Sequence, residues 1–154
     1  MTPIELVDSL VDFFKKAVAE YDLATKTGAG KRPQVYAGYL PPKDKGDDSS
    51  EFPFILVRYL EEDDNDEASE VKIGVIIGTY CEDEQTGWRD PLNIATRLKI
   101  ALKKTAVIGP YSLTKVIKVE LYEEQPFPYW YATMEMSLNV PQVQIDWSEH
   151  HFDF

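Results

Sequence analysis

Apolar residues recur at helical spacing at the start of the chain and again around residue 95. Residues 2–5 read Thr-Pro-Ile-Glu, which is typical of a capping box with proline at the first helical position. Apolar side chains then follow at steps of three and four: Ile4, Val7, Leu10, Val11, Phe14, Ala17, Val18 and Tyr21. This stripe predicts a helix that runs to about residue 24 and packs one face against a core.

A second apolar stripe predicts another helix of the same kind. Its members are Leu92, Ala95, Leu98, Ala101 and Leu102. Asp90, which precedes Pro91, is the expected N-cap, because its carboxylate can accept from free amides of the first turn. Gly109-Pro110 is expected to close this helix.

The remaining apolar positions follow strand patterns. Residues 34–39 form a short extended piece, residues 52–60 are apolar on both faces, and residues 71–80 are rich in β-branched side chains. Residues 112–121 alternate between apolar and polar positions, as does the stretch from residue 129, whose apolar face is Trp130, Ala132, Met134, Met136 and Leu138. The polar residues 41–50 predict a loop, and the acidic residues 61–67 predict the tip of an extended hairpin.

The order of these elements indicates the fold class. It reads helix, short strand, hairpin, helix, hairpin, and sequential strands joined by short connections pair as neighbours by default. We therefore expect an α+β fold, with a mainly antiparallel sheet of about four to five strands packed by two helices. Residues 1–141 are expected to form a single domain, followed by a C-terminal tail at residues 142–154.

The amino-acid composition limits the kinds of molecule that this chain can bind tightly. The 154 residues include 16 Lys and Arg against 27 Asp and Glu, for a net charge of −11. Tight non-specific binding to DNA or to an anionic membrane needs the opposite balance. The single cysteine, Cys81, cannot form an internal disulfide, and residues 1–20 lack the basic start and long apolar run of a secretory signal. We therefore expect an intracellular protein with no membrane partner.

No motif of catalysis or of metal or cofactor binding stands out in the chain. The acidic residues 61–67 contain neither the spacers nor the glycine of a calcium loop. His150 and His151 are adjacent near the C-terminus, and Cys81 is followed by Glu82 and Asp83, whose charge suppresses a thiolate. We expect no enzyme, metal or cofactor, and keep as an alternative a small acid–base hydrolase that uses the carboxylates and the two histidines.

Aromatic and charged clusters suggest contacts with other proteins instead. The aromatic residues near 88 and 127–131 either pack the core or form a protein-binding surface, because large rigid rings anchor such contacts. Basic segments also stand apart from the acidic segment in the sequence, which suggests complementary patches on neighbouring subunits. The candidate interface residues are Lys31, Arg32, Glu61, Glu62, Asp63, Asp64, Lys103, Lys104, Phe127 and Trp130.

Four segments together resemble a known family. They are FPFILVR at residues 52–58, IIGTY at 76–80, GWRD at 87–90 and EEQPFPYW at 123–130. The combination resembles the tail-terminator, or tail-completion, proteins encoded by long-tailed bacterial viruses and prophages. It covers about residues 50–141 and leaves out residues 41–50 and the C-terminal tail.

The resemblance implies a structural virion protein. Such a subunit forms a ring, usually a hexamer, that caps the head-proximal end of the tail tube and catalyses no reaction. Its partners would be identical subunits, the major tail tube protein and the head-connector proteins, and DNA would only pass through. It would be found in the virion tail, and in the host cytoplasm during assembly.

Two other non-enzymatic interpretations stay open at this stage, as does the position of the acidic residues within a ring. A head-closure or head–tail joining protein of the same neck region would also be a small ring former. A monomeric adaptor domain would have no viral role at all. Within a ring, the acidic residues 61–67 would either line the bore that DNA crosses or form an exterior solubilising loop.

Overall fold

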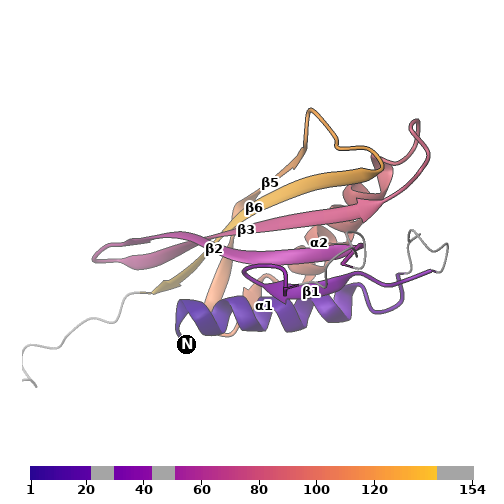
Figure 1. Cartoon of the computed structure of the whole chain (residues 1–154). Coiled ribbons are helices and arrows are strands. Elements are labelled where there is room, and N and C mark those ends of the chain that lie inside the picture. The colour runs from indigo at the N-terminus through magenta and orange to yellow at the C-terminus, as the bar shows by residue number, and fades with distance from the viewer. Residues whose placement is uncertain (22–29, 43–50, 142–154) are drawn as a thin grey trace, which may run out of the picture.

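The computed structural model describes residues 1–21, 30–42 and 51–141. Two helices and six strands follow in this order: α1 (Pro3–Ala17), β1 (Gln34–Ala37), β2 (Phe54–Asp64), β3 (Ala68–Tyr80), α2 (Arg89–Thr105), β4 (Val107–Ile108), β5 (Tyr111–Leu121) and β6 (Tyr129–Pro141). The strands form one twisted sheet in the order β1-β2-β3-β6-β5-β4 (Figure 1). The α+β class with two helices is confirmed. The loop expected at 41–50 falls mostly, and the C-terminal tail wholly, outside the described residues.

The expected sheet of four to five mainly antiparallel strands is only partly right. There are six strands, and β1 pairs with β2 in parallel, with Val35 opposite Ile55, while the other neighbouring pairs are antiparallel. Two parallel strands start at the same end of a sheet, so the chain must cross back from the end of β1 before β2 can begin. Residues 38–53 make that connection. The extra strand, β4, has only two residues, too few to give an alternation signal in the sequence.

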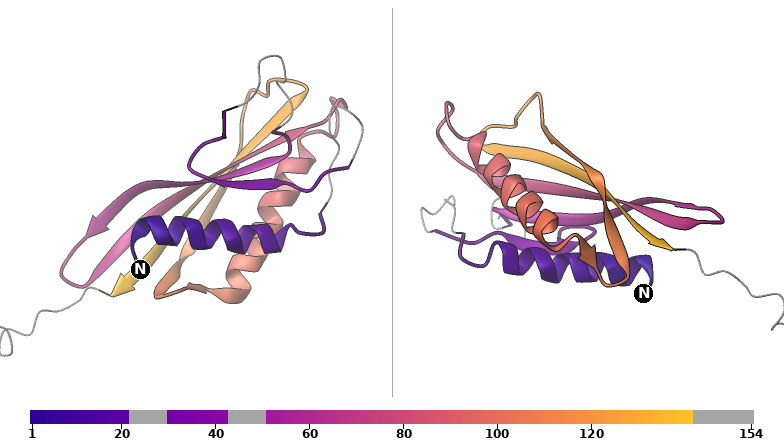
Figure 2. Two further views of the ribbon diagram at one scale, coloured as in Figure 1. Left: turned by 60° about the horizontal axis from the view of Figure 1, so that its bottom comes forward. Right: turned by 180° about the vertical axis from the view of Figure 1, so that it is seen from behind.

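Both helices pack on the same face of the sheet (Figure 2). The capping box of α1 is confirmed: Glu5 N donates to Thr2 Oγ1 at 3.1 Å, and Thr2 N donates to Glu5 Oε2 at 3.0 Å. The helix ends at Ala17, earlier than expected, and its fully buried residues include Leu6, which the predicted stripe left out. Ile4 is 76% exposed, because it stands at the edge of the buried stripe, on the side of the exposed Asp8.

The predicted ends of α2 are wrong. Trp88 occupies the N-cap position without a side-chain cap bond, and Asp90 lies inside the first turn. The helix stops at Thr105, where Ala106 takes a left-handed conformation with φ of 61°. Gly109-Pro110 instead turns the chain between β4 and β5.

The sheet carries apolar side chains on both faces at its centre. The predicted alternation of β6 is confirmed, since its five expected apolar residues are all buried. On the helix-free face a second cluster forms around Phe52 and Phe54, with Tyr129 and Tyr131 packed against them. The Phe52 and Tyr129 rings lie 4.6 Å apart. Gly78 leaves room for this cluster, because a Cβ there would lie 2.4 Å from the Phe54 ring.

Candidate functional site

One strongly charged surface of the described residues is the far end of the β2–β3 hairpin, residues 61–70, which we call the acidic hairpin. It reads EEDDNDEASE, with seven acidic residues and no base. Only Asn65 to Glu67 form its turn, where Asn65 Oδ1 accepts from Glu67 N at 2.8 Å and from Ala68 N at 3.0 Å. The expectation that residues 61–67 are all tip is therefore wrong: residues 61–64 belong to β2 and pair with residues 69–72 of β3.

Little positive charge offsets this hairpin from within the described chain. Lys72 Nζ lies 3.2 Å from Glu61 Oε1, and both side chains are largely in solvent, so the pair contributes little stability. The hydrogen bond and charge of Glu61 raise the pKa of Lys72, with smaller contributions from Glu135 and Asp63. Among the described residues, no three His, Cys, Asp or Glu side chains are placed to hold a metal ion. The acidic hairpin thus presents its charge to solvent or to a partner.

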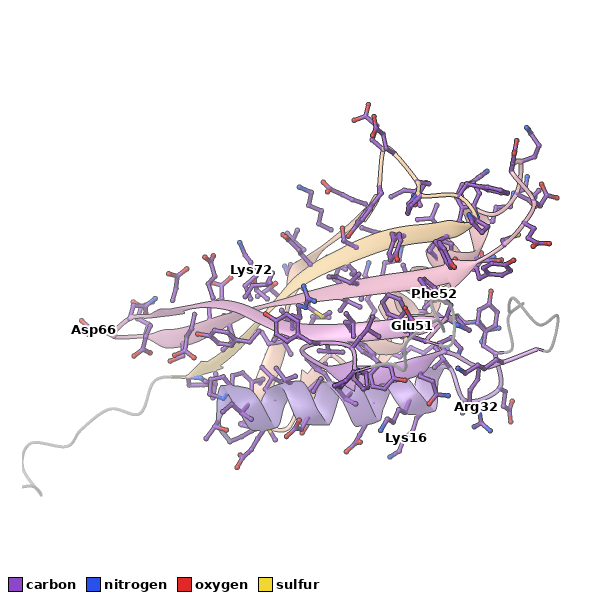
Figure 3. All side chains as sticks on the ribbon, viewed as in Figure 1. Lys16, Arg32, Glu51, Phe52, Asp66 and Lys72 are labelled. Carbon is purple, nitrogen blue, oxygen red and sulfur yellow. The ribbon has the colours of Figure 1, made fainter. Side chains whose placement is uncertain are left out.

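The predicted basic residues lie in two separate places. Arg32 lines a shallow hollow of about 360 Å³ with Lys15, beside the C-terminal end of α1. Figure 3 shows Lys16 and Arg32 at one end of the molecule and Asp66 at the other. We call the surface of Lys15, Lys16 and Arg32 the basic end.

Lys103 and Lys104 stand elsewhere, in the last turn of α2. That turn leads into β4 and β5, where Tyr111 Oη lies 3.4 Å from Met1 O, at the start of α1 rather than at its end. The structure therefore does not bring these two lysines together with Lys31 and Arg32. The two pairs belong to different elements, since Lys31 and Arg32 come shortly before β1, whereas Lys103 and Lys104 close α2.

The two predicted aromatic interface residues have different roles. Trp130 is only 8% exposed, and its Nε1 donates to Cys81 O at 2.9 Å. Its indole packs against Gly87, so Trp130 belongs to the interior and its assignment to an interface is wrong. Phe127 is 48% exposed and lies edge-on to the Trp130 ring at 6.2 Å, so it remains available for a contact.

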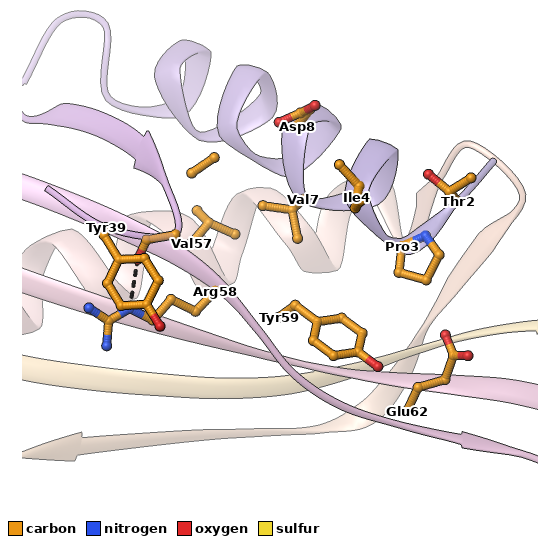
Figure 4. Close-up of a pocket in the computed structure, with 12 residues that line it drawn as sticks. Thr2, Pro3, Ile4, Val7, Asp8, Tyr39, Val57, Arg58, Tyr59 and Glu62 are labelled. Carbon is orange, nitrogen blue, oxygen red and sulfur yellow. Dashed lines mark hydrogen bonds between the residues drawn. The ribbon is translucent and has the colours of Figure 1, made fainter. Parts of the chain in front are cut away.

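A groove that the sequence did not predict lies between α1 and the outer edge of β2 (Figure 4). Its volume is about 560 Å³, and we call it the edge groove. Three exposed apolar side chains line it, Ile4, Tyr39 and Tyr59. Arg58 stacks on the Tyr39 ring at 4.3 Å, and its Nε donates to Gly38 O at 2.6 Å, which fixes one wall.

Perturbed titrating groups are scattered rather than gathered at one site. Tyr80 Oη donates to Glu82 Oε1 at 2.6 Å, and that bond, with burial and the Glu82 charge, raises the pKa of Tyr80 to about 12. Burial raises the pKa of Asp90 in the first turn of α2. Burial, together with the negative charge of Glu51, also raises the pKa of Tyr36. Each shift has a local packing cause, and none of these groups lines the edge groove.

No protein-family model matches this chain, and no curated protein is significantly similar to it. No helix within residues 1–21, 30–42 and 51–141 is long and apolar enough to cross a membrane. A functional proposal therefore depends on three surface features: the acidic hairpin, the basic end and the edge groove.

Proposed function

We propose that this protein is a structural subunit of a phage tail, which forms a ring that caps the head-proximal end of the tail tube and joins it to the head connector. The resemblance of residues 50–141 to tail-terminator proteins suggests this role. Its partners are identical subunits, the major tail tube protein and the head-connector proteins, and it acts without catalysis.

The observation that carries this proposal is the separation of charge along the molecule. Asp66 marks one end, while Lys16 and Arg32 mark the other (Figure 3). A closed ring uses heterologous contacts, in which one patch of a subunit meets a different patch of the next. The acidic hairpin of one subunit and the basic end of its neighbour supply such a pair, and opposite charges also set the register of the contact.

A charge-swap experiment tests this contact. Reversing Asp63 and Asp64 to lysine, or Lys16 and Arg32 to glutamate, should each weaken ring formation by about tenfold or more in ~0.1 M salt. A mixture of the two variants, in which the reversed patches meet, should recover it. Lys115→Glu, a charge reversal at an exposed site on β5, is the matched control and should leave the ring unchanged.

The ring is measured by native mass spectrometry and electron microscopy, with and without the tube protein. If both reversed variants form rings as well as the parent chain, the hairpin does not make the subunit contact. If the parent chain stays monomeric even with tube protein present, the proposed function fails and a monomeric adaptor is favoured.

Virus assembled without this protein separates the proposal from its nearest alternative. A tail terminator stops tube growth, so its loss should give overlong tubes. Loss of a head-closure or head–tail joining protein should instead give tails of normal length that stay detached from heads. Replacing both His150 and His151 by alanine addresses the hydrolase alternative, since normal tails from that variant argue against a reaction that needs them.

The acidic hairpin has a second possible place in the ring. A bore that DNA must cross should not bind phosphates, and acidic side chains on its wall would prevent binding. If the hairpin lines the bore, lysine substitutions at Glu61 and Glu62 should slow DNA ejection. Normal ejection from that variant would place the hairpin outside the bore.

A further inference from the structure

The outer edge of β2 is open next to the edge groove. Among the described residues, β1 pairs with β2 only from Phe54 to Val57. The chain then turns away at Gly38, whose φ of +78° favours glycine. Beyond Val57, β2 continues to Asp64 with β3 on its inner side and no described strand on its outer side. Backbone groups along an open edge of this kind can pair with a further strand.

The groove beside this edge is lined mainly by apolar side chains, together with the charged side chains of Asp8, Arg58 and Glu62. Ile4 and Tyr39 are 76% and 73% exposed, and Tyr59 is 49% exposed. Large apolar side chains gathered at an open strand edge are typical of sites where an extended peptide adds to a sheet. In that mode the edge supplies main-chain hydrogen bonds, and alternate side chains of the added strand enter the groove.

The chain itself contains a segment that suits this groove. Residues 142–149 read QVQIDWSE, and Val143, Ile145 and Trp147 alternate with Gln144 and Asp146. A period of two gives an added strand one apolar face and one polar face.

The direction of β6 determines which groove this segment can fill. Both β6 and β2 run antiparallel to β3, so they are parallel to each other. At its end Pro141 pairs with Ala68, beside the turn of the acidic hairpin. The chain therefore leaves the sheet while travelling away from its own groove, and filling that groove would require it to reverse and pass two strands. The 13 residues after Pro141 can extend up to about 45 Å, enough to reach an adjacent subunit without a reversal.

We propose that residues 142–149 of one subunit add as a strand to the outer edge of β2 in the next, and place Val143, Ile145 and Trp147 in its edge groove. This inference rests on the proposed ring, because it supplies one of the heterologous contacts that a ring repeats. The segment that fills the groove of one subunit is supplied by a second copy of this chain.

Disulfide trapping tests which subunit supplies the strand. In a Cys81→Ser background, one protein carries Ile4→Cys and another carries Ile145→Cys. After the two are mixed and oxidised, they should form a disulfide-linked pair. Ile100→Cys, an exposed position on α2 outside the groove, is the matched control and should not be trapped. The inference is overturned if no mixed pair forms, or if Ile4→Cys and Ile145→Cys close only within a single doubly substituted chain.

Peptide binding measures the contact itself. A labelled peptide of residues 142–154 should bind the chain that ends at Pro141, and Ile4→Glu should weaken that binding by about tenfold or more. Ile100→Glu should change it by less than about twofold. Equal binding by the Ile4→Glu and Ile100→Glu chains would show that the peptide uses another surface, and would overturn the inference.

Removing residues 142–154 separates this inference from the function on which it rests. The shortened chain should need at least about tenfold more protein to form rings than the full chain. If the shortened chain forms rings as readily as the full chain, the strand addition is refuted and the ring stands. If the full chain forms no ring with or without tube protein, the proposed function itself fails.

Discussion

Replacing Gly87 by alanine tests the packing between the turn before α2 and Trp130. A Cβ at Gly87 would lie 2.3 Å from both Cε2 and Nε1 of the indole, far inside van der Waals contact. The indole cannot move away freely, because Nε1 donates to Cys81 O at 2.9 Å and the ring is 8% exposed. Either the turn or the indole must therefore shift.

The expected cost is the sum of three effects. Forcing an extra methyl into a packed interior costs ~1–3 kcal/mol. Losing the indole hydrogen bond adds ~1 kcal/mol. Alanine also restricts the unfolded chain more than glycine does, which offsets ~0.4–1 kcal/mol. The free energy of unfolding should therefore fall by about 2 kcal/mol, whereas the unfolded-chain effect alone would raise it.

Urea unfolding followed by circular dichroism measures this change. Combining Gly87→Ala with Trp130→Phe removes the clashing indole atoms, so the two substitutions should be less than additive by about 1 kcal/mol or more. Gly38→Ala is the control for backbone strain alone, since its φ is +78° and nothing lies within 4 Å of the added Cβ. A Gly87→Ala chain as stable as the parent would refute the close approach of Gly87 and Trp130.

Three further substitutions test local features of the fold. Thr2→Ala removes the side-chain acceptor for Glu5 N and should lower the free energy of unfolding by about 1 kcal/mol in the same assay. An unchanged free energy of unfolding would argue against the capping box. Ala106→Gly should raise it by up to about 1 kcal/mol, because glycine accepts the φ of 61° without strain; a loss would contradict that conformation. Glu82→Gln should lower the pKa of Tyr80 from about 12 toward its ordinary 10.0, as ultraviolet titration of the phenolate can show. The folded chain keeps the proton of the Tyr80 hydroxyl to higher pH than the unfolded chain does. The Tyr80–Glu82 hydrogen bond therefore stabilises the fold below about pH 10, and this contribution is lost as the pH rises to about 12. A parent chain whose stability does not fall over that range would refute this linkage.

Elements specified by local patterns could be predicted from the sequence. The capping box at Thr2 depends on residues three positions apart, and the alternation along β6 depends on residues two apart. Both predictions were confirmed, because the residues that form each pattern are also the residues that stabilise the local structure. The end of α2 could not be predicted in this way. Ala106 adopts a left-handed conformation that alanine rarely takes, and the neighbouring sequence does not indicate it.

Features that depend on distant contacts could not be predicted in the same way. Trp130 and Phe127 are both aromatic and close in sequence, yet only Trp130 is covered, by a glycine more than 40 positions earlier in the chain. Ile4 fits the spacing of a buried stripe, but it stands at the edge of that stripe, where it lines the edge groove and is 76% exposed. The parallel pairing of β1 also depends on a long return connection, which short-range pairing rules do not anticipate.

Salt separates the two contacts proposed for the ring, because they depend on different forces. The contact between the acidic hairpin and the basic end joins exposed charges, and screening shortens their reach from about 10 Å at 0.1 M salt to about 3 Å at 1 M. Strand addition at the edge groove depends on main-chain hydrogen bonds and on burial of Ile4 and Tyr59, which simple salt weakens little and sulfate strengthens. Peptide binding should therefore persist at 1 M sodium chloride while rings of the shortened chain dissociate. If both were lost together at high salt, charge alone would hold the subunits, and the apolar groove would contribute nothing to the ring.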